Sequence, residues 1–141
     1  MKKYKIEPEV AGGLGHNTLG NFDIHPPQIS HLDYEFDDWL GDELIERFPV
    51  FIVSENLAKS LQNSDLTGFE IANCEVSKAG IFEDLHPGGL DLPTFFWLKI
   101  NGNNENDDFL ISPDFYLTVS EHALNLLKKF NLRHAEITAL D

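Results

Sequence analysis

The sequence predicts an α+β fold in which helices pack on one side of a mostly antiparallel sheet. Three observations predict it: two apolar runs that each lead into an amphipathic helix, a short alternating segment after each helix, and further strand-like runs around these units. The 141 residues show no low-complexity linker or break in composition, and 42% of them are hydrophobic. A chain of this size buries most of its apolar surface in one core, so we expect a single domain over residues 1–141.

Two segments of the chain are similar to each other. Residues 53–71, VSENLAKSLQNSDLTGFEI, align without a gap on residues 119–137, VSEHALNLLKKFNLRHAEI, at an offset of 66 positions. Seven of these 19 positions are identical, among them the Val-Ser-Glu that opens each segment and the Glu-Ile that ends it. The repeat is too long and occurs too few times for a solenoid, so it predicts two pseudo-symmetric units, at about 51–71 and 115–138, that share one sheet.

Each unit has the pattern of a strand, a helix and a second strand. The apolar runs that end at Val53 and Val119 are each followed by a serine, whose hydroxyl is suited to cap a helix, and by a glutamate, which is favourable at the positive helix end. Leu57, Ala58 and Leu61 are spaced to form one apolar helix face, and the second copy repeats this spacing. The sequence therefore predicts one helix in each unit.

Further strands are expected outside the repeat. Residues 31–36, HLDYEF, alternate between apolar and polar side chains, whereas residues 94–100, TFFWLKI, form a more continuous apolar run that is typical of a central strand. The polar residues 101–108 predict a loop, and the His-Pro-Gly-Gly at 86–89 predicts a turn.

The chain is strongly acidic. It has 10 basic and 24 acidic side chains, so its formal net charge is −14 with neutral histidines. Such a charge repels nucleic acid and anionic lipid, because binding to either depends on Lys and Arg side chains. We therefore expect neither a nucleic acid nor a membrane as a partner, and a basic or neutral protein instead. The alternative is that the acidity only keeps the protein soluble.

The cellular location is predicted by two absences in the sequence. No apolar run approaches the roughly 18 residues of a membrane span, and none follows the basic N-terminus. Cys74 is the single cysteine, which excludes an intrachain disulfide or a sulfur-rich zinc site and suits a reducing compartment. We expect a cytoplasmic protein that needs no cofactor.

Residues 10–27, VAGGLGHNTLGNFDIHPP, resemble a phosphate-binding loop in their glycine content. A P-loop needs a Lys and a Ser or Thr after its last glycine, and a dinucleotide fingerprint needs a third glycine in register within a βαβ unit. This segment has neither. We interpret Gly12, Gly13, Gly15 and Gly20 as positive-φ or tight-turn positions of a long ordered loop.

The same region offers a weak metal-binding hypothesis. Asp23, His25, His31 and Asp33 are close in sequence, but a Pro-Pro pair separates the histidines and no known zinc spacing is present. The chain also lacks a G-x-S-x-G elbow, and Cys74 lies in a strand-like setting. We therefore predict that the protein is not an enzyme, with a small-molecule or metal-binding enzyme built around this loop as the alternative.

Residues 33–46, DYEFDDWLGDELIE, interleave seven carboxylates with three aromatic side chains. One interpretation is an amphipathic strand and turn with solvated acids. The other is a protein-binding edge, where the acids orient a basic partner and Trp39 anchors it. A calcium loop is a third option, but its ligand spacing is missing. The candidate partner-binding residues are Asp33, Glu35, Asp37, Asp38, Trp39, Asp42, Glu43 and Glu46.

Several segments resemble a known protein family. They are ERFPVFIVSE at residues 46–55 with the helix that follows, LTGFE at 66–70, and YLTVSE at 116–121 with its helix. They are similar to the bacterial immunity proteins of polymorphic toxin systems, in particular a family formerly known only as a domain of unknown function and typified by a myxobacterial protein. The resemblance does not extend to the Gly-rich N-terminal segment.

The resemblance implies a small cytoplasmic protein that binds and blocks a cognate toxin and has no catalysis of its own. It implies no particular functional residues, because inhibitory surfaces diverge together with the toxin. Together with the acidic composition, the resemblance leads us to expect a basic toxin domain as the partner, and a nuclease is one candidate. The carboxylates would then imitate the phosphates of the nuclease's substrate. A structural subunit of a larger complex is a further alternative, and the sequence carries no signal for an oligomeric state.

Overall fold

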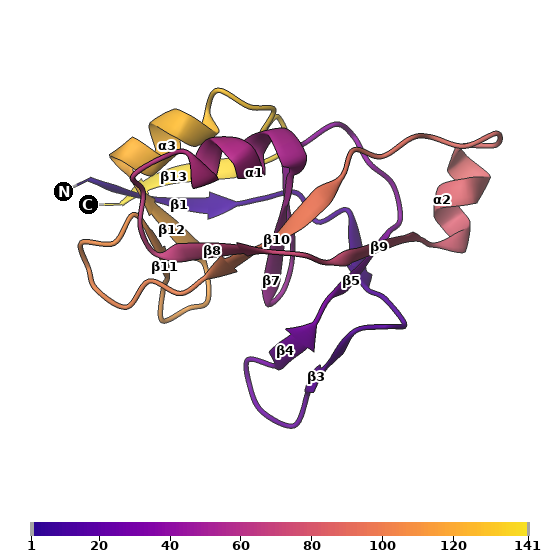
Figure 1. Ribbon diagram of the computed structural model, residues 1–141, viewed down its shortest axis with the longest axis horizontal. Helices are drawn as coiled ribbons and strands as arrows, with labels where there is room; N and C mark the ends of the chain where they lie inside the picture. Colours follow the sequence, from indigo (N-terminus) through magenta and orange to yellow (C-terminus); the bar gives the residue numbers. More distant parts are fainter. Residues whose placement is uncertain (1, 141) are drawn as a thin grey trace.

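The computed structural model describes residues 2–140 (Figure 1). These residues form three helices among short strands. In chain order the elements are β1 Lys3–Glu7, β2 Gly12–Leu14, β3 Leu19–Asn21, β4 Gln28–His31, β5 Asp33–Phe36, β6 Leu44–Arg47, β7 Val50–Ser54, α1 Glu55–Gln62, β8 Phe69–Ala72, β9 Glu75–Lys78, α2 Gly80–Leu85, β10 Phe95–Ile100, β11 Phe109–Ile111, β12 Leu117–Ser120, α3 Glu121–Leu127 and β13 Glu136–Leu140.

Most of the strands belong to two four-stranded sheets. One has the strand order β6-β7-β10-β8 and the other has the order β11-β12-β1-β13. A three-stranded sheet, β2-β5-β9, and the hairpin of β3 and β4 complete the architecture. Every pairing between these strands is antiparallel except that of β5 with β9, which is parallel. The predicted α+β class with mostly antiparallel strands is confirmed.

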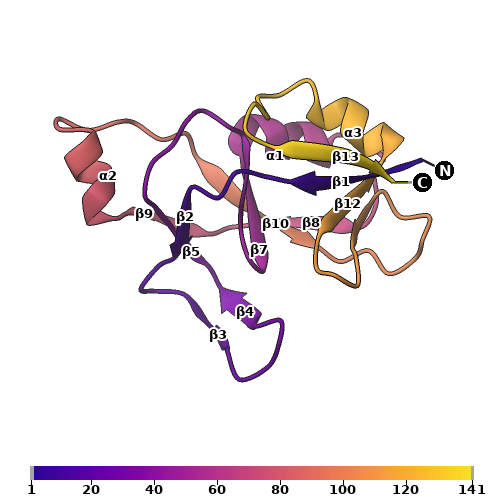
Figure 2. The same ribbon diagram turned by 180° about the vertical axis from the view of Figure 1, so that it is seen from behind.

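The two similar sequence segments form β7-α1-β8 and β12-α3-β13, but they do not share a sheet. Strand β10 lies between β7 and β8, and strand β1 lies between β12 and β13, so each segment completes a sheet of its own. The prediction of one common sheet is therefore wrong. Within each segment the two strands do not pair with each other, because a strand from outside the segment, β10 or β1, lies between them. Helices α1 and α3 lie side by side over these sheets (Figures 1 and 2).

The strands predicted outside the repeat are largely present. The apolar run at 94–100 is β10, which occupies the predicted central position in its sheet. The alternating run at 31–36 is divided into β4 and β5, which belong to different sheets.

Each of the two longer helices begins at a serine whose hydroxyl is hydrogen-bonded to a carboxylate. The hydroxyls of Ser54 and Ser120 accept hydrogen bonds from the backbone N–H three residues later, at 3.2 Å and 3.1 Å. Each hydroxyl donates in turn, Ser54 to Glu43 Oε1 at 2.9 Å and Ser120 to Asp108 Oδ1 at 2.6 Å. The predicted capping serines are therefore confirmed, and each has a carboxylate partner.

Strand β7 separates two hydrophobic cores. Phe51 and Val53 pack in the first core, with α1, α3 and the second four-stranded sheet. Val50 and Ile52 pack in the second core, with β5 and α2. Both faces of β7 are buried, which explains why its sequence is continuously apolar rather than alternating.

Helix α2 is an element that the sequence analysis did not predict. It is six residues long, it starts at Ala79, which has no side chain that can cap it, and it buries Phe82 alone. A helix this short gives little periodicity to detect. Figure 1 shows α2 at the end of the molecule away from β11 and β12.

Candidate functional site

Two of the predicted partner-binding carboxylates lie inside the protein. Asp33 is 3% exposed, and its oxygens accept hydrogen bonds from Ser77 Oγ at 2.8 Å and from the backbone N–H of Asn17 at 3.3 Å. Asp42 is 0% exposed, and its two carboxylate oxygens are hydrogen-bonded to the backbone N–H and to the ring Nδ1 of His134. Neither carboxylate belongs to the exposed acidic surface that the sequence predicts, because each is buried and accepts hydrogen bonds from residues of other segments.

Glu43 and Glu46 are half-buried. Glu43 accepts the hydroxyl of Ser54 at the start of α1, so its carboxylate has a structural contact. Glu46, on β6, lines a small pocket whose other residues are mostly apolar. These two residues face different parts of the molecule and do not form one acidic surface with the rest.

Three of the predicted carboxylates remain at the surface. Asp37 is exposed, and Glu35 and Asp38 are half-buried. Asp38 Oδ1 lies 2.7 Å from His86 Nε2, and the hydrogen bond with this imidazole lowers the pKa of Asp38 below its ordinary value. These residues lie in and just after β5, next to α2.

Trp39 is half-buried and is committed to internal contacts. Its indole Nε1 donates to the backbone carbonyl of Asp42 at 2.8 Å, and its ring packs edge-on against Phe95 with 6.1 Å between ring centroids. Part of the ring also lines a surface groove beside the start of α1. The tryptophan therefore holds the chain after β5 in place.

Helix α2 extends the acidic surface in a way that the sequence analysis missed. The backbone N–H of Ala79 donates to the carbonyl of Phe36 at 2.8 Å, and His86 is bonded to Asp38, so both ends of α2 are tied to the end of β5. Ile81 and Leu85 are each 54% exposed although they are apolar, and they lie one helical turn apart. We name this region the α2 surface and define it by Asp37, Asp38, Ile81, Glu83, Asp84 and Leu85.

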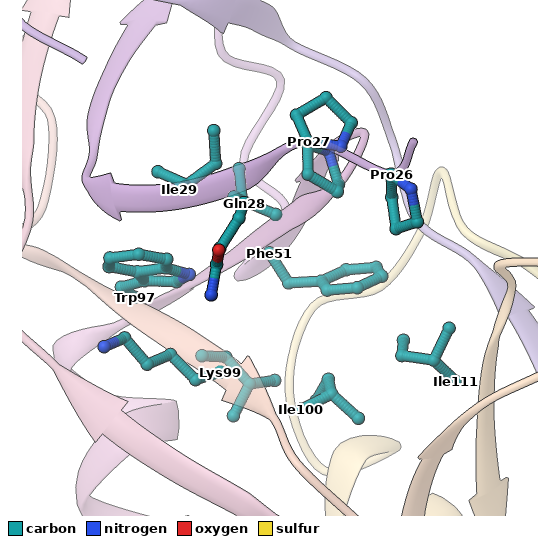
Figure 3. A pocket seen from close by; sticks show the side chains of 12 residues that line it. Pro26, Pro27, Gln28, Ile29, Phe51, Trp97, Lys99, Ile100 and Ile111 are labelled. Atoms are coloured by element: carbon teal, nitrogen blue, oxygen red, sulfur yellow. The ribbon is translucent and has the colours of Figure 1, made fainter. Parts of the chain in front are cut away.

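The Gly/His-rich segment, residues 10–27, is not one long loop as the sequence predicts, because it contains β2, which pairs with β5, and β3, which pairs with β4. Figures 1 and 2 show the β3–β4 hairpin standing away from the body of the molecule. A groove of about 260 Å³ lies between this hairpin and strands β7 and β10 (Figure 3). Its walls are mostly apolar, and its polar side chains are Gln28 and Lys99, with the Trp97 indole beside them. The ammonium of Lys99 lies 4.4 Å from the centre of the Trp97 ring.

The four residues of the metal-binding hypothesis do not converge. The His25 ring packs against Phe48 and Phe115, at centroid distances of 5.6 and 5.2 Å. The ring of His31 is hydrogen-bonded to Glu75 instead, and the buried carboxylate of Asp33 accepts a hydrogen bond from Ser77. Among residues 2–140, this region holds no group of three or more potential metal ligands.

The pocket beside Glu46 has a volume of about 100 Å³ and is lined by the rings of Phe48, Phe51 and Phe115, with prolines and an isoleucine. Burial in these surroundings raises the pKa of Glu46 from 4.5 to about 7, and the charge of nearby Glu7 adds to the effect. The folded state therefore holds a proton on Glu46 at pH values where the unfolded chain has released it.

This proton makes stability depend on pH. The contribution of Glu46 is complete below the unfolded pKa of 4.5 and is lost as the pH rises through the folded value of about 7. We expect Glu46→Gln to leave the free energy of unfolding unchanged near pH 4.5 and to raise it by about 2 kcal/mol near pH 8, after allowance for partial exposure. Urea unfolding at several pH values measures this difference.

Glu136→Gln, a change at an exposed carboxylate on β13, is the matched control. A gain for Glu46→Gln that does not depend on pH, or that equals the gain of the control, would contradict the assigned burial effect.

A second cluster of titratable groups was not predicted from the sequence. Glu9, Asp42 and His134 bring one ligand atom each to within 4.8 Å of one another. Asp42 Oδ1 lies 2.7 Å and Glu9 Oε2 lies 3.2 Å from His134 Nδ1. Burial, followed by the charge of Asp42, raises the pKa of Glu9. The three residues are far apart in sequence and have no recognisable spacing, so only folding reveals the cluster.

Comparisons with known proteins leave the family open. No family model, no curated protein and no solved structure matches the chain. The resemblance to immunity proteins therefore stays a prediction. Within the described residues, none of the helices has the length and apolar character that a membrane-spanning helix needs.

Proposed function

We propose that this protein is a non-catalytic immunity protein, which binds a basic toxin domain in the cytoplasm and neutralises it. The observation that carries the proposal is the α2 surface. It combines two exposed apolar side chains, Ile81 and Leu85, with the carboxylates of Asp37, Glu83 and Asp84. Apolar contacts of this kind supply affinity at the centre of an interface, and surrounding acids steer a basic partner and fix its orientation.

Two further observations support the proposal. The net charge of −14 favours association with a basic protein and disfavours nucleic acid and anionic membranes. The segments quoted above resemble immunity proteins in the strands and helices that form the first core. The sequence predicts Trp39 as the anchor of the interface. In this proposal Ile81 and Leu85 are the anchors instead, because their side chains are more exposed than that of Trp39.

We also propose that the β7-α1-β8 and β12-α3-β13 units are related by pseudo-symmetry. Their sheets have the same strand order, in which a hairpin precedes the helix and a strand from elsewhere is inserted. The carboxylate partners of the two capping serines correspond as well: Glu43 immediately precedes β6, and Asp108 immediately precedes β11.

The two units also exchange equivalent hydrogen bonds. Glu43 Oε2 accepts the backbone N–H of Asn131, in the loop after α3, at 2.9 Å. Asp108 Oδ2 accepts the backbone N–H of Thr67, in the loop after α1, also at 2.9 Å. Each carboxylate thus links the start of its own helix to the loop that follows the other helix, as a two-fold relation requires.

The partner is tested by affinity capture of the tagged protein from a lysate of its native host at low salt. Elution in salt steps and mass spectrometry then identify what was bound. We expect a stoichiometric basic domain that salt releases, because charge steering is screened over a Debye length of about 10 Å at 0.1 M salt. If the toxin is present in the lysate and no stoichiometric partner is captured, the proposal is contradicted.

The binding surface is tested with the captured partner by reversing three charges, Asp37→Lys, Glu83→Lys and Asp84→Lys. We expect the association rate to fall by about tenfold or more at low salt and the difference to shrink at high salt. Stopped-flow or surface-based kinetics at two salt concentrations measure the rates.

The matched control carries the same change of charge around β11: Glu105→Lys and Asp114→Lys in the loops on either side of this strand, and Asp65→Lys beside Asp108, all at exposed positions. Figure 1 shows β11 at the end of the molecule away from α2. Equal effects of the two triple variants would show that only net charge matters and would remove the α2 surface from the proposal.

The groove of Figure 3 favours a second candidate function, the binding of a small apolar molecule. Its mostly apolar wall with two polar side chains, Gln28 and Lys99, is typical of small-molecule sites. Native mass spectrometry of the purified protein tests it. A bound molecule of defined mass that is lost in Trp97→Ala would favour this function, and its absence in the wild-type protein would count against it.

A further inference from the structure

The cluster of Glu9, Asp42 and His134 is built from three separate segments. Glu9 follows β1 and is fixed by its backbone carbonyl, which accepts the N–H of Glu46 at 2.9 Å. Asp42 precedes β6, and His134 precedes β13. Within residues 2–140 it is the one group of three or more His, Cys, Asp or Glu side chains whose ligand atoms converge in this way.

The hydrogen bonds within this cluster leave one buried oxygen unsatisfied. His134 donates its backbone N–H to Asp42 Oδ2 at 2.9 Å, and its ring Nδ1 lies 2.7 Å from Asp42 Oδ1. A single hydrogen on Nδ1 serves this nearer oxygen. Glu9 Oε2, at 3.2 Å from the same nitrogen, is buried and has no hydrogen-bond partner, and the Glu9 side chain is 11% exposed. A buried carboxylate oxygen without a donor is unfavourable.

A divalent cation satisfies all three groups at once. It would replace the proton on His134 Nδ1 and bind one ligand atom each from Glu9, Asp42 and His134. It would also neutralise the two carboxylates, whose ligand atoms lie within 4.8 Å of each other. Asp38 adds a further negative charge nearby, which acts on Glu9. Two carboxylate oxygens with one imidazole nitrogen suit Zn²⁺ or Mn²⁺ better than Ca²⁺ or Mg²⁺, which prefer oxygen ligands alone.

The site is also oriented and accessible. The Asp42 side chain is 0% exposed, and its second oxygen is fixed by the backbone of His134. Supporting hydrogen bonds of this kind are typical of metal ligands. The His134 side chain is 35% exposed, so the cluster lies close to the surface, where water would complete the coordination of a bound ion.

We propose that Glu9, Asp42 and His134 form a binding site for a divalent transition-metal ion of the zinc or manganese type, which ties the N-terminal segment to the loops before β6 and β13. The role is structural, since the ion joins three segments that are distant in sequence. It is independent of the proposed toxin binding, and neither result decides the other.

The test uses the full chain freed of metal with a chelator and then given Zn²⁺ or Mn²⁺. We expect one bound equivalent by elemental analysis after gel filtration, and a midpoint of thermal unfolding raised by about 5 °C or more at about a hundredfold excess over the dissociation constant. Competition with a fluorescent chelator measures the affinity.

Two variants locate the ion. Glu9→Gln is nearly isosteric, and His134→Asn removes the ring ligand but keeps the backbone N–H that holds Asp42. Each is expected to weaken binding by about 100-fold or more, beyond the loss typical of a supporting residue. His86→Asn is the control, because it removes another His–carboxylate pair, with Asp38, that has no third ligand beside it among the described residues.

Three results would overturn the proposal. They are an absence of stoichiometric binding by the wild-type protein, binding that both ligand variants retain, and binding that the His86→Asn control loses equally. Circular dichroism of each metal-free variant checks that it is folded. If one ligand variant does not fold, the other and the metal-induced shift of the wild-type protein decide.

Discussion

Gly12→Ala is expected to destabilise the protein by about 3 kcal/mol, whereas Gly13→Ala at the next position is expected to change its stability by less than about 1 kcal/mol. A Cβ atom at Gly12 would lie 1.9 Å from the backbone oxygen of Glu35 and 2.9 Å from the Cα of Phe36. These atoms belong to β5, the neighbouring strand, and cannot move aside as a flexible side chain can. A Cβ atom at Gly13 would have no neighbour within 4 Å.

Urea unfolding of the two variants measures the difference directly. Because both substitutions reduce the flexibility of the unfolded chain equally, their difference isolates the contact between β2 and β5. Similar stabilities of the two variants would contradict the close packing of these strands. The same contact explains the glycine at this position, which the sequence analysis took for a turn glycine; φ at Gly12, Gly13, Gly15 and Gly20 is not in the left-handed region.

Replacing both capping serines is expected to cost about 3 kcal/mol. Ser54→Ala and Ser120→Ala each remove a helix cap and leave a carboxylate, Glu43 or Asp108, without its hydroxyl donor. Loss of a cap costs about 1 kcal/mol, and an unsatisfied acceptor adds to it, so we expect about 1.5 kcal/mol for each variant. In the described hydrogen bonds the two hydroxyls share no partner, so the two effects should add.

Ser60→Ala, at a half-buried position within α1, is the control and should be neutral or slightly stabilising, because alanine has the higher helix propensity. Equal losses at the two capping positions are what the proposed pseudo-symmetry requires. If one capping variant behaves like the control, the two units are not held in the same way.

The sequence predicts the local elements well where a strong pattern is confined to one segment. The apolar run at 51–53, the serine after it and the helical spacing up to Leu61 predict β7 and α1 correctly, and the run at 94–100 predicts β10. The assignment of strands to sheets is less predictable, because it depends on pairing over long distances. Nothing in the basic N-terminal residues shows that β1 lies between β12 and β13.

The acidic stretch at residues 33–46 shows what a sequence pattern cannot predict about a candidate site. Its alternation predicts β5 correctly but cannot tell a solvated carboxylate from a buried one. Asp33 and Asp42 are buried because Ser77 and His134, which follow much later in the chain, supply their hydrogen bonds. The sequence does not indicate a role for Glu9 for the same reason, because Asp42 and His134 come close to it only in the folded chain.

The central claim is that the protein neutralises a basic toxin, and a growth measurement tests it most directly. The partner captured at low salt is expressed in a laboratory bacterium from an inducible promoter, alone or together with the protein. We expect the partner alone to stop growth and the wild-type protein to restore it, with the triple charge reversal on the α2 surface restoring it less than the control reversal around β11. A partner that does not affect growth, or a toxic partner that the protein binds without protecting the cell, would contradict the account.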